Sequence, residues 1–500
     1  MISVLRENGR RWWSLFADNV LIKNSIIYSL GIILNKTIGF FLIPVYTRYF
    51  SVSEYGVLSL LTMIAQLVSF FFLMGIGTAA TRFYYDTLSD EDYRRNVYGT
   101  AFFLSLALPV ILAVILGPVI YLLCALFLPS IPFFPLIFIV VITNLFNPMV
   151  ILAVGYLRIQ KKAKVYVIFS LASFLLQSIL CILAALWLDL GIRGQLYAQL
   201  ATMIVFFGVS SILIIRQTGV RFSRAISKKL LRYGVPLIPF FFFSWIDLAS
   251  GRLLLEKFGS LADVGIFSLA AQFVGIFVVF GNAFDYSMTP IFYEIAQDPD
   301  AGDKLGRFAL KFFNLFGVGT LFVALFAKPL VLAMADRRYH AAVGYLPFLL
   351  LAAFLGLLFK IFNWNLMFSK KTGLLSWITS VTAVLMVVFL VVFLKFFRLG
   401  ILGVTIAMIL VGVVRLIFGY IVSTKHFRLR FDFKKIGVSS LILVAAFVAI
   451  AFVRVPASLA AEIGLKSAAF GISAALLLKA SGIKTLKLLL SKNLKNSVGA

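Results

Sequence analysis

The sequence is poor in charge and in the residues that build catalytic or metal sites. Of its 500 residues only 13% are charged, and it holds two cysteines and two histidines. Cys124 and Cys181 lie inside apolar runs, while His340 and His426 stand apart, so we expect neither a disulfide framework nor a metal cluster. No P-loop occurs, which excludes ATP as a direct energy source. We therefore expect no enzyme, no catalytic residues, no metal and no bound cofactor.

Apolar residues, in contrast, make up 62% of the chain, and its mean hydropathy is +1.05. A soluble protein is about 45–50% apolar, so this chain has too little polar surface for water and must face lipid. Its apolar runs predict about fourteen transmembrane helices, and the short segments between them leave no room for a large soluble domain. We read the first run as a retained span and not as a cleaved signal peptide. The predicted spans are 22–46, 56–80, 97–127, 133–157, 165–187, 194–215, 234–256, 264–286, 308–332, 343–368, 374–395, 400–422, 437–455 and 463–479.

The net charge of +27 lies in short loops between apolar runs, which favours a membrane protein over a nucleic-acid-binding one. Most of the 46 lysines and arginines fall in alternate loops, on the same side as both termini. The segments 158–164 and 216–232 show this bias best. Because basic loops stay on the inner side of a bacterial membrane, we expect a multi-pass inner-membrane protein with both termini in the cytoplasm.

The sequence also contains a short internal repeat. Segment 47-TRYFSVSEYGVLSL-60 aligns without a gap with 256-EKFGSLADVGIFSL-269, so that a basic residue, an acid and a glycine recur at equal spacing. The two segments follow the first span of each predicted half. Many transporters consist of two such repeats with the substrate site between them near the middle of the membrane.

Residues 23–86 resemble the opening of the polysaccharide transporters in the multidrug/oligosaccharidyl-lipid/polysaccharide (MOP) exporter superfamily, which include Wzx-type flippases. The likeness rests on the Asn24–Ser25 start, the P-V-Y-T-R sequence at 44–48, the S-x-x-E-Y-G turn at 51–56 and the ending 75-GIGTAATRFY-84. The resemblance implies an all-α polytopic protein with two pseudo-symmetric six-helix lobes and two C-terminal helices. We accordingly expect three parts: an N-terminal lobe with an interfacial N-terminus (1–216), a C-terminal lobe (217–425), and the last two spans with a basic amphipathic cytoplasmic tail (426–500).

The resemblance also implies a function. Such proteins carry undecaprenyl-pyrophosphate-linked oligosaccharide from the cytoplasmic to the outer leaflet by alternating access, for surface polysaccharides such as O-antigen. The implied partners are this lipid-linked substrate, membrane lipids, and a polymerase and glycosyltransferases of the same pathway, with no nucleic acid. A proton gradient, a sodium gradient or the membrane potential would supply the energy.

Charged residues inside the spans are the candidates for substrate contact, because each costs roughly 2.5–3.5 kcal/mol at a helix centre. Lys36 lies near the middle of the first span and would attract a pyrophosphate. Lys360 shares a helix face with Asn363 and Trp364, a set suited to sugar binding, but it is close enough to the interface to reach water instead. Arg415 is another candidate substrate contact, although interface anchoring is an alternative role.

Two aspartates, Asp247 in the seventh span and Asp285 at the inner end of the eighth, are candidates for cation or proton coupling or for ion pairs. The repeat alignment places Lys36 opposite Trp245, two residues from Asp247, so Lys36 and Asp247 are expected at similar depths and could pair. Three further basic residues are predicted at the cavity mouths. Arg82 matches the family's arginine at the end of the second span, the inner mouth, and the repeat-related Arg48 and Lys257 lie at the outer mouth.

Two other functions remain as alternatives within the superfamily. A multidrug or organic-cation antiporter would need an acidic cavity, whereas the charges within the spans here are mainly basic. A peptidoglycan-precursor flippase shares the expected fourteen spans. A membrane-bound glycosyltransferase would need larger external loops than this sequence provides.

Overall fold

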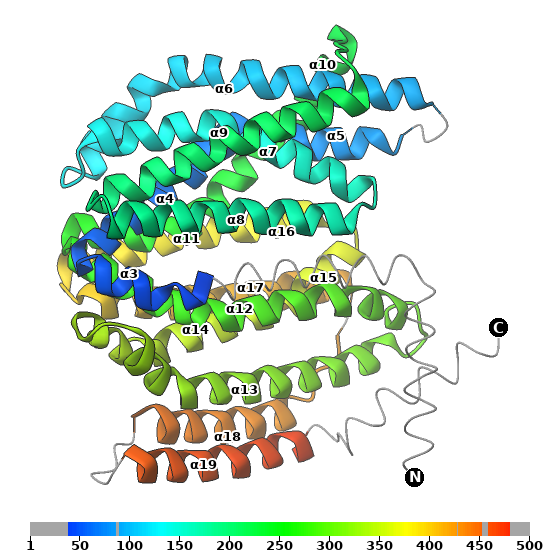
Figure 1. The fold of residues 1–500 in the computed structure, drawn as a ribbon. Helices are drawn as coiled ribbons and strands as arrows, with labels where there is room; N and C mark the ends of the chain where they lie inside the picture. The colour runs from blue at the N-terminus through cyan, green and yellow to red at the C-terminus, as the bar shows by residue number, and fades with distance from the viewer. Residues whose placement is uncertain (1–38, 87–89, 428, 453–458, 481–500) are drawn as a thin grey trace, which may run out of the picture. The chain divides into compact units, whose positions relative to one another are not determined.

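In the computed structural model, every described element is a helix, which confirms the all-α class. The structure describes residues 39–86, 90–427, 429–452 and 459–480 (Figure 1). Among these residues, 12 helical segments are long and apolar enough to cross a membrane. They correspond to the second to thirteenth predicted spans. The fourteenth coincides with a further helix at 459–480, and most of the first lies outside the described residues.

Several helices are longer than the apolar runs that predicted them, because capped polar turns extend their ends. The third predicted span, for example, lies within a 37-residue helix that begins at an Asp90 cap and stays helical through Pro109 and Pro118. The helices are α3 (Ile43–Tyr49), α4 (Val52–Leu73), α5 (Ile76–Tyr84), α6 (Glu91–Phe127), α7 (Phe138–Ile159), α8 (Ala163–Leu186), α9 (Gly191–Thr218), α10 (Arg224–Gly234), α11 (Ile238–Phe258), α12 (Leu261–Ile295), α13 (Ala301–Met334), α14 (Leu346–Leu358), α15 (Lys360–Phe368), α16 (Thr372–Val391), α17 (Gly400–His426), α18 (Phe433–Phe452) and α19 (Leu459–Ala480), with short η1 (Phe133–Ile137), η2 (Val235–Leu237), η3 (Arg337–Gly344) and η4 (Val392–Phe396).

The chain divides into two compact units, residues 1–265 and 266–500. In unit 1, α7 packs against α4, α6 and α9, and α11 packs against α4. Small residues such as Ala79 and Ala153 allow this close packing and are fully buried with Tyr98 and Met149 in one cluster. The predicted three-part division at 216 and 425 stays a prediction.

In unit 2, α17 packs against α14, α15 and α16, while α13 packs against α14, α18 and α19. Figure 1 shows α18 and α19 side by side next to α13. The last two predicted spans therefore pack on α13, the ninth predicted span. The tenth predicted span consists of two helices, α14 and α15, which meet at Phe359, so that Lys360 begins α15.

The internal repeat has a clear structural meaning at the starts of α4 and α12. The Ser51 hydroxyl accepts the N–H of Glu54, and the Glu54 carboxylate accepts the N–H of Ser51, which is a complete capping box. At the repeat-related positions, the Ser260 hydroxyl accepts the N–H of Asp263 and donates to its carboxylate at 2.7 Å. The repeated serine and acid are thus helix-start signals.

The repeated glycine brings these two helix starts into contact within unit 1. A Cβ atom on Gly56 would overlap the carbonyl oxygen of Leu261, and one on Gly265 would overlap that of Val52. Val52 and Leu261 are themselves equivalent positions of the repeat, so the contact is symmetric. Only glycine permits so close an approach of the two backbones.

Candidate functional site

A largely enclosed ion pair joins two of the predicted charges, both in unit 2. The Lys360 ammonium lies 2.6 Å from the Asp285 carboxylate, and the two side chains are 18% and 21% exposed. The other carboxylate oxygen accepts the indole N–H of Trp364 at 2.7 Å. Asp285 thus links α12 to α15 through one charged and one neutral donor, and a substrate anion would have to compete with it for Lys360.

Trp364 supports this pair from a fully packed position. Its side chain is 1% exposed and lies against the rings of Phe292, Phe308 and Phe312. The indole therefore has no free face for a sugar in this structure, contrary to the expectation from sequence. Its neighbour Asn363 has a buried side-chain oxygen without a hydrogen-bond partner in the described part of the chain.

Arg415 lies on α17 and reaches α16. Its guanidinium donates two hydrogen bonds to the Thr382 hydroxyl, at 3.2 and 2.9 Å, and lies 6.0 Å from the ring centre of Phe359. Arg415 and Lys360 thus flank the junction of α14 and α15, one through Phe359 and the other as the next residue along the chain.

The predicted mouth residues of unit 1 lie at opposite ends of α4. Arg48 is exposed just before this helix, whereas Arg82 is exposed at the end of α5, beyond the other end of α4, and pairs with Asp86. A helix of 22 residues is about 33 Å long, so Arg48 and Arg82 are separated by the thickness of a bilayer. Lys257 ends α11, and its ammonium lies 4.8 Å from the ring centre of Phe127.

The remaining two predicted residues concern the first and seventh spans. Asp247 is half-buried on α11, while Lys36 lies outside the described residues. The pairing of Lys36 with Asp247 therefore stays a prediction.

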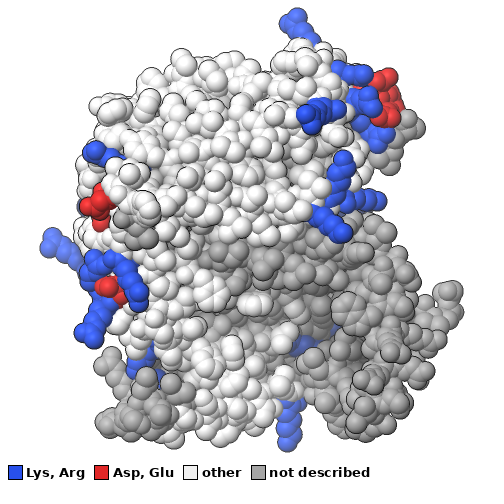
Figure 2. Space-filling view, in the orientation of Figure 1, with Lys and Arg blue, Asp and Glu red and all other residues white. Residues whose placement is uncertain are grey.

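Charged surface residues of unit 1 gather at the ends of its helices. Figure 2 shows Lys and Arg at both ends of the unit 1 helices on the visible face, with an uncharged surface between them. This is the surface expected of helices that cross a bilayer.

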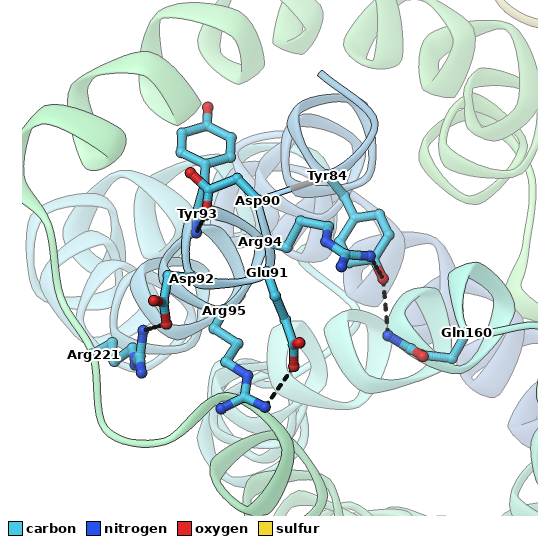
Figure 3. A network of polar contacts seen from close by, with 9 residues as sticks. All are labelled: Tyr84, Asp90, Glu91, Asp92, Tyr93, Arg94, Arg95, Gln160 and Arg221. Atoms are coloured by element: carbon cyan, nitrogen blue, oxygen red, sulfur yellow. Dashed lines mark hydrogen bonds and ion pairs between the residues drawn. The ribbon is translucent and has the colours of Figure 1, made fainter. Parts of the chain in front are cut away.

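At the end formed by α5, α6 and α7, a polar network holds the helices together (Figure 3). The Tyr84 hydroxyl accepts from Arg94 at 3.2 Å and from Gln160 at 3.0 Å. Arg95 pairs with Glu91, and Arg221 pairs with Asp92 at 2.7 Å. Arg94, Arg95 and Arg221 are therefore each matched by a carboxylate or a phenol.

Each unit contains a well-formed pocket that sequence reasoning did not predict. A pocket of about 440 Å³ in unit 2 lies among α12, α13 and α14, and phenylalanines form much of its wall, including Phe273, Phe277 and Phe316. A pocket of about 370 Å³ in unit 1 is more polar and includes Thr78, Thr81 and Arg158.

A family model described as "Polysaccharide biosynthesis protein" matches residues 45–344, more than half of the chain. The chain belongs to this family. No curated protein matches this sequence.

Three solved structures have the same fold as this chain. The lipid II flippase MurJ in an inward closed conformation aligns with a TM-score of 0.67 at 16% identity, over 91% of this chain and 99% of that chain. A multidrug resistance MATE transporter of the MOP superfamily, in an inward-facing conformation, aligns with a TM-score of 0.62 at 16% identity, over 80% of this chain and 95% of that chain. An outward-facing MATE transporter aligns with a TM-score of 0.55 at 18% identity, over 81% of this chain and 95% of that chain. The fold is therefore that of MOP-superfamily transporters.

Two charged residues were not singled out from the sequence. Arg252 lies inside α11, within the seventh predicted span, and donates to the Leu248 carbonyl. Glu256 is 5% exposed, and neither carboxylate oxygen has a hydrogen-bond partner in the described part of the chain. Their spacing of four residues within one helix is the signal that could have identified them.

Proposed function

We propose that this protein is a flippase that moves polyprenyl-diphosphate-linked oligosaccharide from the cytoplasmic to the outer leaflet of the bacterial inner membrane by alternating access. The family match over residues 45–344 carries this proposal. It points to surface polysaccharides, and polysaccharide precursors must cross the membrane before they are assembled outside the cell. We expect O-antigen or a related glycan as the final product.

The fold supports a transporter. The solved structures with the same fold are a lipid flippase and multidrug transporters. The likeness to the lipid II flippase covers 91% of this chain, against 80% for the inward-facing multidrug transporter. This difference favours a lipid-linked substrate over a soluble organic cation.

Side-chain chemistry supports an anionic head-group with an apolar tail. Lys36, Arg48, Arg82, Lys257, Lys360 and Arg415 are the basic residues proposed to act on the head-group. A positive path lowers the cost of moving a diphosphate through a region of low dielectric constant. The phenylalanine-walled pocket of unit 2 offers apolar surface that an isoprenoid chain would fill.

Energy for transport would come from an ion gradient or the membrane potential. Asp247 and Asp285 are the acidic residues within helices that we propose for coupling, either directly or through an ion pair. In this structure Asp285 is engaged with Lys360, so a cation at Asp285 would have to displace the lysine ammonium.

The test is to delete the gene in its host and follow the lipid-linked oligosaccharide. We expect surface glycan to disappear while the full-length precursor accumulates on the cytoplasmic leaflet. A plasmid copy of the gene should restore the surface glycan. Normal surface glycan with altered drug sensitivity would contradict the proposal and favour the multidrug antiporter. A loss of peptidoglycan synthesis without loss of surface glycan would instead favour the peptidoglycan-precursor flippase.

A further inference from the structure

The polar pocket of unit 1 is built by a break between α4 and α5. Met74 and Gly75 both adopt left-handed backbone angles, with φ of 43° and 67°. This turn lets α5 leave the line of α4, so that Thr78 and Thr81 contribute to the pocket wall. Gly75 packs against Gly234. A Cβ atom added to Gly75 would lie 2.8 Å from the Cα atom of Gly234.

The opposite wall comes from α7, and glycines keep the space between the helices open. Gly77 and Gly155 both line the pocket, and an added Cβ on Gly155 would reach only the Thr81 hydroxyl, at 4.0 Å. Phe70 and Phe241 supply the aromatic part of the lining, and their rings stack with centres 5.5 Å apart. The result is a cavity of about 370 Å³, a size that accommodates a small charged group.

Arg158 is the charged residue of this pocket, and its positive charge is not balanced locally. Arg82, Arg95 and Arg221 at the same end of unit 1 each pair with a carboxylate. Arg158, in contrast, forms no salt bridge with any described residue, and its guanidinium lies 5.2 Å from the ring centre of Tyr166. A cation–π contact with an aromatic face orients a guanidinium without neutralising it.

The side chain of Arg158 is exposed, and the backbone that carries it is anchored by neighbouring contacts. It lies in the last turn of α7, and the next residue but one, Gln160, donates to the Tyr84 hydroxyl at 3.0 Å (Figure 3). Arg94 donates to the same oxygen from α6 at 3.2 Å. The end of α7 is thus fixed to α5 and α6, so the position of Arg158 relative to Thr81 is fixed by the packing of the helices.

A guanidinium beside threonine hydroxyls and small backbone surfaces matches a phosphate group. Arginine donates parallel hydrogen bonds to two oxygens of one phosphate, and the Thr78 hydroxyl can donate to a third. The Thr81 hydroxyl donates to the Gly77 carbonyl at 2.9 Å and would have to rotate to donate to the phosphate. The pocket lies at the end where α4 and α7 finish, which the distribution of basic residues predicts to face the cytoplasm, where a lipid-linked precursor is made. We propose that Arg158, with Thr78 and Thr81, forms the entry site for the diphosphate of the lipid-linked substrate. This inference rests on the proposed function.

The phosphate chemistry is shared by a polyprenyl diphosphate and by an anionic phospholipid, and a binding experiment separates them. The full-length protein in phosphatidylcholine nanodiscs is titrated with undecaprenyl diphosphate, undecaprenol or phosphatidylglycerol. We expect the diphosphate to bind more tightly than the other two. Arg158→Gln should weaken its binding about 10- to 100-fold, the loss expected for charge-assisted hydrogen bonds. The affinity of Arg158→Lys for the diphosphate should fall between those of the wild type and Arg158→Gln, because an ammonium keeps the charge but lacks the planar pair of donors.

Two further variants separate the role of the pocket from a general change of charge. Gly155→Leu fills the cavity and leaves Arg158 in place, so it should also weaken diphosphate binding. Arg95→Gln removes a positive charge at the same end, but one that already pairs with Glu91, and it should bind as the wild type does. Thermal unfolding of each variant checks that it is folded.

Each result has a distinct meaning. If wild-type protein discriminates diphosphate from undecaprenol but Arg158→Gln and Gly155→Leu bind normally, the entry site is wrong and the proposed function stands. If wild-type protein does not discriminate them, diphosphate recognition and the proposed function both fail. If phosphatidylglycerol binds as tightly as the diphosphate and also depends on Arg158, the pocket is a site for membrane lipid and the assignment to substrate is overturned.

Discussion

Two of the predicted charged residues inside the helices, Lys360 and Arg415, are bound into specific local contacts. Lys360 has Asp285 and Arg415 has Thr382, and each of these pairs joins two different helices. Such contacts remove much of the cost of placing charge in the membrane, and they also fix how neighbouring helices pack. A residue of this kind can serve transport only by exchanging its partner for substrate or for an ion.

The pair of Lys360 with Asp285 gives a prediction at this scale. Lys360→Met or Asp285→Asn alone should destabilise the protein by roughly 3 kcal/mol or more, because each leaves a buried charge without its partner. The double variant should lose less than the sum of the two single variants. Thermal unfolding in detergent provides the measurement. Strictly additive losses would contradict an energetic coupling between these two residues.

How much of the site was predictable from sequence is clearest for these residues. Charge within an apolar run was enough to identify Lys360, Asp285 and Arg415 as unusual. Their partners were not predictable from sequence. Thr382, the partner of Arg415, lies on another helix, and Trp364, which donates to Asp285, also lies on another helix and is a common type of core residue. Arg158 was missed because it borders a basic loop, where an arginine at a helix end is expected for topology alone.

At the scale of helices, the repeated sequence motif is explained by local physics. Ser51 and Ser260 cap α4 and α12, and the glycines five residues after these caps allow the two helix starts to touch. A second correspondence follows the sixth span of each predicted lobe, the sixth and the twelfth spans of the chain. Arg221 pairs with Asp92, and Arg430 pairs with Asp303 at 3.1 Å. Sequence comparison could not find this second pair, because its spacing differs slightly between the halves.

The glycine contact predicts a position-specific loss of stability. Gly56→Ala or Gly265→Ala should destabilise the protein by about 1–3 kcal/mol, because a methyl group would overlap a backbone carbonyl and force the helices apart. Gly117→Ala and Gly208→Ala are matched controls, since an added Cβ there meets nothing within 4 Å. These controls should be neutral or slightly stabilising. Equal melting temperatures for all four variants would refute the close contact.

The start of α18 predicts a dependence on pH. The pKa of Asp432 is lowered because its carboxylate accepts the backbone N–H of Lys435 and also pairs with that lysine's ammonium. A carboxyl with a lowered pKa in the folded state stabilises the helix start at neutral pH, and this contribution is lost as the pH falls through the lowered pKa. Asp432→Asn keeps a capping oxygen but not the charge.

Amide hydrogen exchange in the first turn of α18 measures this effect. At neutral pH we expect faster exchange in Asp432→Asn than in the wild type. In acid, below the lowered pKa, the two proteins should exchange alike. A difference of the same size at both pH values would mean that the charge of Asp432 does not contribute.

At the scale of the whole molecule, the fold class and the positions of the spans were predictable, because lipid requires long apolar helices and little else. Helix ends were not, since capping residues such as Asp90 extend helices beyond the apolar run. The break at Phe359 between α14 and α15 was also hidden, because it lies within one continuous apolar stretch. Which residues line the pockets depends on packing between distant segments.

The orientation in the membrane stays a prediction and can be measured directly. Cys124 and Cys181 are first replaced by alanine, and single cysteines are placed at Lys162 and Ser130, both of which are exposed. An impermeant thiol reagent added to intact cells should label position 130 and leave position 162 unlabelled until the membrane is permeabilised. Labelling of position 162 but not of position 130 would reverse the orientation.

The central claim is that this protein alone moves a diphosphate-linked glycan across a bilayer, and reconstitution tests it most directly. Purified protein is placed in liposomes that carry a fluorescent polyprenyl-diphosphate oligosaccharide, with a membrane-impermeant quencher added outside and an ion gradient applied. Without protein, the quencher reaches only the label in the outer leaflet. With protein we expect nearly all of the label to be quenched, whereas the inner-leaflet fraction of a labelled neutral polyprenol glycoside should stay protected. Quenching no greater than in protein-free liposomes, under proton, sodium and potential gradients alike, would contradict the central claim.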